Sequence, residues 1–510
     1  MSRRHLLGLR VTGKNSIPSF KRIVLFRLAA IAIGLLPLFV LETVLQIGDW
    51  PTVNAVDDPY VGFTEIRPLF IHNESKTHYE ISGSRFPLFQ PDSFLIDKPG
   101  NEFRIFCVGG STVQGRPFAI ETAFSKWMEL NLNVADSSKK WRVINCGGVS
   151  YASYRLVPIV DEILNYEPDL IVLYTGHNEF LEDRTYESVK QTPTWIARTH
   201  DRLSSSKTYT LLRRYLTTQS KSIASDSVEN TLSAEVKARL DFSNGLAQYT
   251  RDDKWKQNVV EHFQLNLRRM TTSIQAANVP LVICNPTCDL RDSPPFKSEN
   301  SADLSQEQLT QFKVLASEME PEENSSTKRT IDNEIDILTS MLEIDPRHAM
   351  THFQIATLYD AKENHELARK HFIQAKEQDI CPLRATEPIY GVIAQVSQSL
   401  NTIDVRGAFE KRAPHGVAGR ESLIDHVHPT IHGHQLIAEM LVEKMAKMKL
   451  VKSVDNETLG AEIAKRHSAH LESLPIGYFQ RGKERLAGLK RWAAGEVKRE
   501  RNDANSQDKP

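Results

Sequence analysis

Four short segments carry the groups that a serine hydrolase needs. In chain order they are Gly110-Ser111, Asn145-Cys146-Gly147, Gly176-His177-Asn178 and Asp425-His426-Val427-His428. A serine hydroxyl becomes a nucleophile when a histidine takes its proton and a carboxylate orients that histidine, while nearby N–H groups stabilise the oxyanion. Each segment is weak evidence alone. Together they make a serine hydrolase the leading hypothesis.

The setting of Ser111 suits a nucleophile. It follows the apolar run 103–108, and glycines on either side of it allow tight turns. A hydroxyl in such a turn is exposed at the carboxyl end of a strand, where backbone N–H groups can meet an oxyanion. Asp425 and His428 are three residues apart, directly before an expected helix. One loop can therefore present His428 as the base and Asp425 as its orienting group.

The elements that must position these residues alternate along the chain. Strands are expected over 103–108, 142–146, 169–174 and 280–284, and helices over 119–132, 154–165 and 254–277. Short apolar strands separated by helices predict an α/β fold, with a parallel sheet covered by helices on both faces. In such folds ligands bind beyond the carboxyl ends of the strands.

At this point the chain resembles the SGNH (GDSL-type) hydrolase superfamily, over residues 103 to about 441 without two insertions. Arg104 to Ser111 looks like the first block, although Gly110 stands where the family usually has Asp. Thr175 to Glu179 looks like the third block, and Asp425 to His428 like the fifth. The resemblance implies that Ser111, His428 and Asp425 form the triad and that the Asn178 amide donates to the oxyanion.

The second block departs most from the family. Val143 to Ser150 has the expected strand and Asn145. Alignment on Asn145 places Ser150 where the family has its oxyanion glycine. Any residue can donate a backbone N–H, so Ser150 could keep the role, and Gly148 is the alternative.

Other residues are candidates for substrate binding or metal binding. His177, Arg184 and Arg291 could contact substrate, against a packing or solvated role for each. A metal site is a second possibility, since imidazoles four apart on a helix can share an ion. The residues concerned are Asp425, His426, His428, His432 and His434. Pro429 and Gly433 weaken that geometry, so no metal and no organic cofactor are expected.

Composition limits the classes of function. A chain of 510 residues is too long for one core. A net charge of −1 gives the protein no overall positive potential that would attract nucleic acid, so a nucleic-acid partner is not expected. Three of the five cysteines, Cys107, Cys146 and Cys284, lie in apolar runs typical of buried strands. Cys284 and Cys288 form a CxxxC spacing without a second pair, which favours a structural role.

The N-terminal part predicts a membrane anchor. Residues 23–45 are almost wholly apolar and long enough to span a bilayer, and the basic segment 1–22 should stay cytoplasmic. The catalytic part would then lie outside the cytoplasm, in the periplasm or at the cell surface. A cleaved signal peptide ending near Ala55 is the alternative. Residues 46–102 are expected to form a linker and an irregular cap.

Two insertions divide the expected hydrolase parts, which are 103–184, 254–300 and 384–450. The first insertion, 185–253, is polar with scattered helical periodicity. The second, 301–383, resembles one full tetratricopeptide repeat after Asp345-Pro346, with an ordinary helical hairpin as the alternative. It could bind a protein partner, and it should be separable from catalysis because no motif lies in it. Residues 451–510 are expected to be surface helices followed by a disordered tail.

The expected function is a membrane-anchored, extracytoplasmic esterase acting on a small ester or an acylated carbohydrate. Two alternatives remain. The same triad could transfer an acyl group to a cell-surface polysaccharide if water is excluded. The chain could also be a partner-binding scaffold with a decayed site.

Overall fold

The computed structural model describes residues 68–182, 236, 238–320, 329–451 and 457–496, with Thr208 and a short helical stretch between residues 34 and 45. The expected anchor 23–45 lies mostly outside the described residues, as do most of the first insertion and the end of the chain. Among the described residues, no helix has the length and apolarity needed to cross a membrane. The chain divides into two compact units, and residues 54–194 and 229–510 form the larger.

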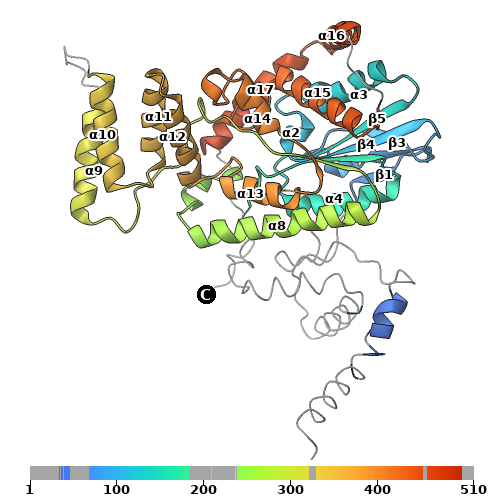
Figure 1. Cartoon of the computed structure of the whole chain (residues 1–510), viewed down its shortest axis with the longest axis horizontal. Coiled ribbons are helices and arrows are strands. Elements are labelled where there is room, and N and C mark those ends of the chain that lie inside the picture. Colours follow the sequence, from blue (N-terminus) through green and yellow to red (C-terminus); the bar gives the residue numbers. More distant parts are fainter. Residues whose placement is uncertain are drawn as a thin grey trace, which may run out of the picture. The chain divides into compact units, whose positions relative to one another are not determined.

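A five-stranded sheet forms its centre (Figure 1). The strands are β4 (Glu102–Gly109), β5 (Lys140–Gly147), β6 (Leu170–Tyr174), β7 (Leu281–Cys284) and β8 (Asn401–Ile403). They are hydrogen-bonded in the order β5-β4-β6-β7-β8, and every neighbouring pair is parallel. The prediction of a parallel α/β sheet is thus confirmed. The fifth strand, β8, was not predicted, because its three residues give almost no pattern.

Helices cover both faces of the sheet (Figure 1). On one side lie α4 (Ser153–Ile163), α8 (Asp253–Ala276) and α13 (Glu387–Val396), and on the other lie α3 (Phe124–Ala135) and α15 (Ile431–Lys447). Alternate strand residues such as Ile105, Val143 and Val172 join α3 and α15 in a large buried cluster. The helix expected over 119–132 begins later, at Phe124, because Ala123 is extended.

A small antiparallel sheet replaces part of the expected irregular cap. It consists of β1 (Phe70–His72), β2 (His78–Ile81) and β3 (Ser93–Leu95). Phe94 packs edge-on against Phe106 of β4, with ring centroids 5.4 Å apart. The prediction failed here because these strands are too short to show periodicity.

The described part of the second insertion, which leaves out residues 321–328, forms four helices. They are α9 (Gln306–Met319), α10 (Ile331–Ile344), α11 (Ala349–Ala361) and α12 (His365–Gln378). Its first half has its own buried cluster, centred on Leu338. The hairpin α11–α12 instead buries Ala368 and Phe372 in one cluster with Val417 and with Val427 of the Asp425–His428 segment. The hairpin α11–α12 therefore contacts the loop that holds the predicted site residues, since Val427 lies between two of them. That the insertion is separable from catalysis stays a prediction.

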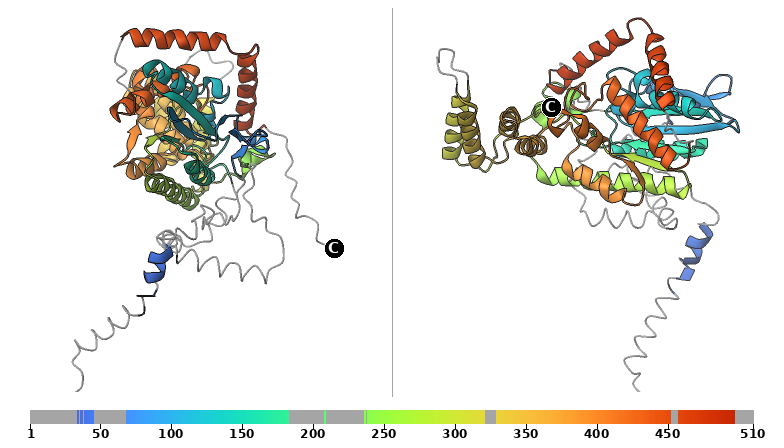
Figure 2. Two further views of the ribbon diagram at one scale, coloured as in Figure 1. Left: turned by 90° about the vertical axis from the view of Figure 1, so that its right-hand side faces the viewer. Right: turned by 45° about the horizontal axis from the view of Figure 1, so that its top comes forward.

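The C-terminal helices pack on the α/β unit. These are α16 (Glu457–Glu472) and α17 (Tyr478–Ala493), which Figure 2 shows in red. On α16, His467 Nε2 lies 2.7 Å from Asn131 Oδ1 of α3. At the start of α17, the Tyr478 hydroxyl lies 2.9 Å from that of Thr122. The helices expected beyond residue 450 thus have specific partners in the core of the unit.

Candidate active site

Ser111 opens a one-turn helix, α2 (Ser111–Gln114), directly after β4. Glycines make this sharp turn possible by allowing close backbone approach. A Cβ on Gly109 would lie 2.1 Å from Tyr174 O, and a Cβ on Gly147 would lie 2.1 Å from Gln114 N. Because any larger residue would collide with backbone at both places, the turn is pressed tightly onto the carboxyl ends of β5 and β6.

Asn145 fastens this turn to the neighbouring strand. Its Nδ2 donates to Val113 O at 2.7 Å and to Ser125 Oγ at 2.7 Å, and its Oδ1 accepts from Gly147 N at 3.0 Å. The side chain is 3% exposed, so its donors and acceptor are satisfied entirely by protein. Asn145 is therefore a residue that positions the serine turn.

Three side chains from the two ends of the unit form a hydrogen-bonded chain. Ser111 Oγ lies 2.8 Å from His428 Nε2. On the other side of the ring, His428 Nδ1 lies 2.7 Å from Asp425 Oδ2 and 2.9 Å from Oδ1. An ionised carboxylate can only accept, so Nδ1 carries the proton of the neutral ring. The other nitrogen, Nε2, is then free to accept the proton of the Ser111 hydroxyl.

The electrostatics of Asp425 support this assignment of protons. Burial alone would raise its pKa, but electrostatic interaction with His428, the hydrogen bond from this ring, and interaction with His426 hold the pKa well below its ordinary value. Backbone N–H groups of Val427 and His428 donate to Asp425 Oδ1, each at 2.9 Å. Asp425 is thus an ionised carboxylate held by its own loop.

Candidate oxyanion donors lie beside Ser111. Asn178 Nδ2 donates to Tyr151 O at 3.0 Å, and a Cβ on Gly110 would lie 2.5 Å from that nitrogen. Glycine at 110, where the resemblance expects Asp, thus leaves room for the Asn178 amide. The two alternatives of the second block differ in their backbone. Gly148 N donates to Gly109 O at 3.0 Å, whereas Ser150 has a left-handed φ of 61° and lines the same cavity as Ser111.

The three residues predicted to contact substrate lie in different surroundings. His177 is buried, and its Nδ1 accepts from Ala385 N at 3.2 Å. Burial, with the neighbouring His426 and His428, lowers the pKa of His177 to about 3, so the ring is neutral. Arg291 pairs with Asp292 and Glu421 and lies away from the Ser111 cavity. Arg184 lies outside the described residues.

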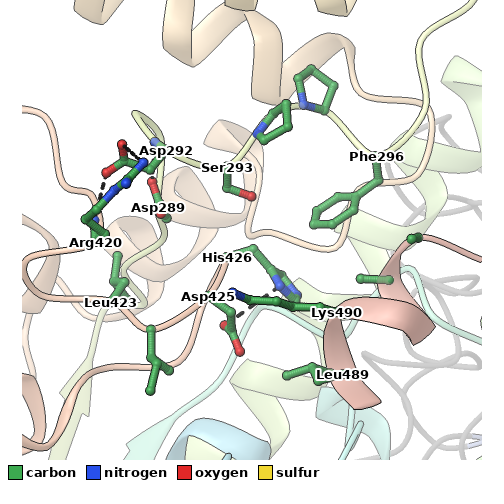
Figure 3. Close-up of a pocket in the computed structure, with 15 residues that line it drawn as sticks. Asp289, Asp292, Ser293, Phe296, Arg420, Leu423, Asp425, His426, Leu489 and Lys490 are labelled. Atoms are coloured by element: carbon green, nitrogen blue, oxygen red, sulfur yellow. Dashed lines mark hydrogen bonds and ion pairs between the residues drawn. The ribbon is translucent and has the colours of Figure 1, made fainter. Parts of the chain in front are cut away.

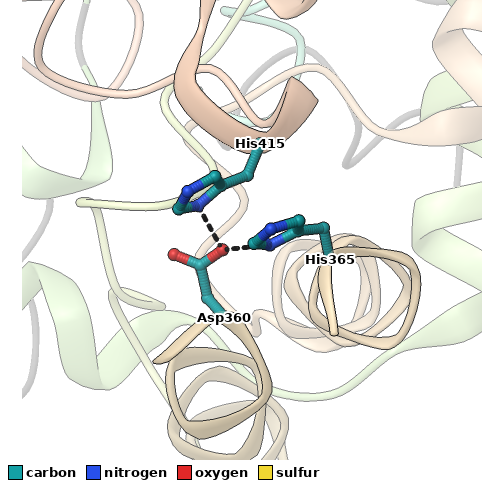
Figure 4. Close-up of side chains that lie close together, drawn as sticks. All are labelled: Asp360, His365 and His415. Atoms are coloured by element: carbon teal, nitrogen blue, oxygen red, sulfur yellow. Dashed lines mark hydrogen bonds and ion pairs between the residues drawn. The ribbon is translucent and has the colours of Figure 1, made fainter. Parts of the chain in front are cut away.

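The C-terminal histidines do not converge on one point. His432 is exposed, and His434 Nδ1 accepts from Phe124 N at 3.3 Å. Among the described residues, a compact group of possible metal ligands occurs elsewhere, at Asp360, His365 and His415 (Figure 4). Both rings place Nδ1 near Asp360 Oδ1, at 3.2 and 2.8 Å, and they stack 3.9 Å apart. Both Nδ1 atoms point at the same oxygen of Asp360. We therefore interpret this group as a hydrogen-bonded link between α11, α12 and the loop at residue 415, and not as a metal site.

A cavity of about 420 Å³ opens over Ser111. This volume is within the usual range for small-molecule sites. Its walls include residues that the sequence did not indicate, namely Arg116, Asp241, Arg485, Leu489 and Trp492. Arg116 could have been predicted from the sequence, because it is only five residues after Ser111 and so must lie near it. The residues of α17 gave no signal, because their approach depends on tertiary packing.

A second cavity, of about 540 Å³, adjoins the first (Figure 3). The two share the side chains of His426 and Leu489. His426 packs edge-on against Phe296, with ring centroids 5.0 Å apart. Burial lowers the pKa of His426 to about 4. A neutral histidine thus lies between the two cavities, next to the triad.

No protein-family model matches the chain, and no curated protein matches it closely enough to count as a relative. Solved structures give distant likenesses. A lipase/acylhydrolase from Enterococcus faecalis is 12% identical, with a TM-score of 0.30, over 69% of this chain and 97% of the other. An α/β-hydrolase enzyme from the metagenome of Lake Arreo is 11% identical, with a TM-score of 0.30, over 69% and 97%. A proposed lipolytic protein of the G-D-S-L family from Desulfitobacterium hafniense is 9% identical, with a TM-score of 0.27, over 67% and 98%. Likenesses this weak carry no argument about chemistry, which rests on the geometry of the site.

Proposed function

We propose that the chain is a serine esterase of the SGNH type. The hydrogen-bonded chain from Ser111 Oγ through His428 to Asp425, at the floor of a cavity, carries this proposal. Buried, satisfied polar chains of this kind are costly to assemble, so their presence at a cavity argues for chemistry. It also argues against a scaffold with a decayed site.

In the proposed reaction Ser111 Oγ attacks the ester carbonyl while His428 Nε2 takes the hydroxyl proton. Asp425 stabilises the imidazolium that forms. The N–H groups of Ser111 and Ser150 and the Asn178 amide donate to the oxyanion. Gly148 is the weaker choice for the second donor, because its N–H already binds Gly109 O. The proton on His428 then goes to the leaving alcohol, and water releases the acyl group in the same way.

Acyl transfer is a second candidate, favoured by one observation. The adjoining cavity shares His426 with the first and reaches Asp425, so an acceptor could lie there while the acyl group occupies the first cavity. In that case an acceptor alcohol would replace water in the second half of the reaction. Measuring free acid against acylated polyol, with and without added polyol, separates the two outcomes.

The test of the proposal combines labelling with kinetics. A fluorophosphonate probe should label Ser111, and p-nitrophenyl acetate should be hydrolysed. Ser111→Ala and His428→Ala should each lower turnover by roughly four to six orders of magnitude, and the double variant should be hardly worse than either, because the two groups act as a unit. Asn178→Ala should lower kcat about a hundredfold to a thousandfold, because it removes one of the oxyanion donors.

Ser340 of α10, which is half-buried and donates only to the backbone of its own helix, gives the control, because Ser340→Ala should leave labelling and turnover unchanged. Labelling of purified protein that persists in Ser111→Ala would refute the assignment of the nucleophile.

A further inference from the structure

An arginine without a protein partner lines the candidate active site. Arg116 follows the serine turn directly and lines the same cavity as Ser111 and Asn178. It is only partly exposed, and its guanidinium has no ion pair or hydrogen bond with any residue that the structure describes. Arginine side chains withdrawn from solvent are almost always paired. The lack of a partner therefore indicates that a ligand supplies it.

A second arginine faces the same space from the C-terminal helix. Arg485 of α17 is exposed at the cavity and donates from Nη1 to Phe118 O at 2.7 Å, which anchors it and leaves its other N–H groups available. Burial and the positive charge of Arg485 lower the pKa of Arg116, and the negative charge of Asp425 only partly offsets them. Two cations that repel each other in a partly desolvated cavity are stabilised by an anion between them.

The carboxylates that lie near this pair bind other groups. Asp425 accepts from His428 and from two backbone N–H groups of its own loop. Asp241, which also lines the cavity, accepts from Trp492 Nε1 at 2.9 Å and from Ala238 N at 3.0 Å. Neither carboxylate forms an ion pair with Arg116 or Arg485 in the described part of the chain.

We infer that the substrate is an ester bearing an anionic oxygen group, a carboxylate or a phosphate, which Arg116 and Arg485 bind while Ser111 attacks the ester carbonyl. The inference rests on the proposed esterase function and adds the substrate class. Two planar guanidinium groups match a carboxylate or phosphate by paired N–H···O bonds. Binding of the anion beside the nucleophile would hold the carbonyl in place and contribute to rate through positioning.

A matched pair of esters tests the substrate class. The mono-p-nitrophenyl ester of glutaric acid and p-nitrophenyl valerate have acyl chains of equal length, but only the first bears a carboxylate. We expect kcat/KM to be at least tenfold higher for the glutarate ester, and Arg116→Gln to lower that preference by at least tenfold, the loss of about one charge-assisted pair. Arg491→Gln, an exposed arginine of the same helix, is the control and should leave the preference unchanged.

Binding keeps the inference testable if no ester is turned over. Glutarate and inorganic phosphate are titrated by calorimetry into Ser111→Ala protein, with and without Arg116→Gln. We expect binding that Arg116→Gln weakens at least tenfold, and the tighter of the two anions indicates which group the substrate carries. Equal kcat/KM for the two esters, or anion binding that Arg116→Gln does not change, would overturn the inference. A failure of both esters with intact anion binding would instead refute the esterase function alone.

Discussion

Ser111 and His428 are 317 positions apart in the sequence, yet Ser111 Oγ and His428 Nε2 lie 2.8 Å apart. Residue types and spacing were enough to predict this pair, because a serine after a strand and a histidine three residues beyond an aspartate have few structural reasons to recur together. The same reasoning could not reveal that Gly148 N is occupied by Gly109 O. That hydrogen bond depends on how β5 ends beside β4, which no local pattern encodes.

Buried histidines make stability depend on pH. His434 is 1% exposed, and burial lowers its pKa to about 3. In the unfolded chain a histidine titrates near its ordinary pKa of about 6.5, so below that pH the unfolded state binds more protons and acidification favours unfolding. Between pH 7 and pH 5 this histidine alone should lower the free energy of unfolding by about 2 kcal/mol.

The prediction is that His434→Gln loses less stability over this pH range than the unmodified protein, by about 2 kcal/mol. Glutamine can keep an acceptor for Phe124 N–H without the titrating ring. Urea unfolding at pH 7 and pH 5 measures the difference, and His432→Gln, at the exposed neighbouring histidine, should show the unmodified pH dependence. An equal loss in both variants would mean that His434 is not kept neutral by burial.

At the scale of secondary-structure elements, the repeat-like hairpin is the clearest case where the sequence predicted an element but not its role. Both interpretations of the sequence after Asp345-Pro346 predicted a pair of helices, and α11 and α12 lie there. Neither showed that Phe372 shares a cluster with Val427. Contacts between an insertion and a distant loop form only when the sheet is assembled, and no local sequence pattern predicts them. The sequence alone therefore suggested that the insertion is separable from catalysis.

Two core truncations separate the halves of the insertion. Phe372→Ala and Leu338→Ala each remove a fully buried side chain. Each should lower the free energy of unfolding of the region around it by about 2–5 kcal/mol. Phe372→Ala should also lower ester turnover, because its cluster supports the loop that carries Asp425 and His428. Leu338→Ala should leave turnover unchanged, since its cluster contains only the helices α9 to α11. Melting curves and kcat for both variants check this, and equal turnover in the two would remove the supporting role of the hairpin.

The docking of α17 depends on a glycine. A Cβ on Gly482 would lie 2.2 Å from Cδ1 of Phe118, so Gly482→Leu should push the helix away from the cavity and lower kcat/KM on the order of tenfold or more. Gly460→Leu in α16, where nothing lies within 4 Å, is the matched control and should retain activity. Limited proteolysis should cut more readily within α17 of the Gly482 variant. Full activity in that variant would show that the helix is not required at the site.

At the scale of the whole molecule, the proposed location rests on residues 1–45. The basic flank and the apolar run predict a single span with the catalytic part outside the cytoplasm. A reporter that functions only outside the cytoplasm, fused after residue 60, should therefore be active. A second fusion, in which all six Lys and Arg residues of the flank are replaced by Gln, should lose activity, because cytoplasmic basic residues set the orientation. The six are Arg3, Arg4, Arg10, Lys14, Lys21 and Arg22. A reporter active only in the cytoplasm would reverse the proposed topology.

The packing of α17 also sets when the site can exist during synthesis. Arg485 and the carbonyl that it binds, Phe118 O, are separated by 367 residues. At about 5–20 residues per second, the ribosome adds the helix roughly 20 to 70 seconds after the serine turn. His428 also arrives late, so a growing chain carries its nucleophile without base, orienting carboxylate or second arginine. Activity on the proposed anionic ester is thus delayed until almost the whole catalytic unit has been made.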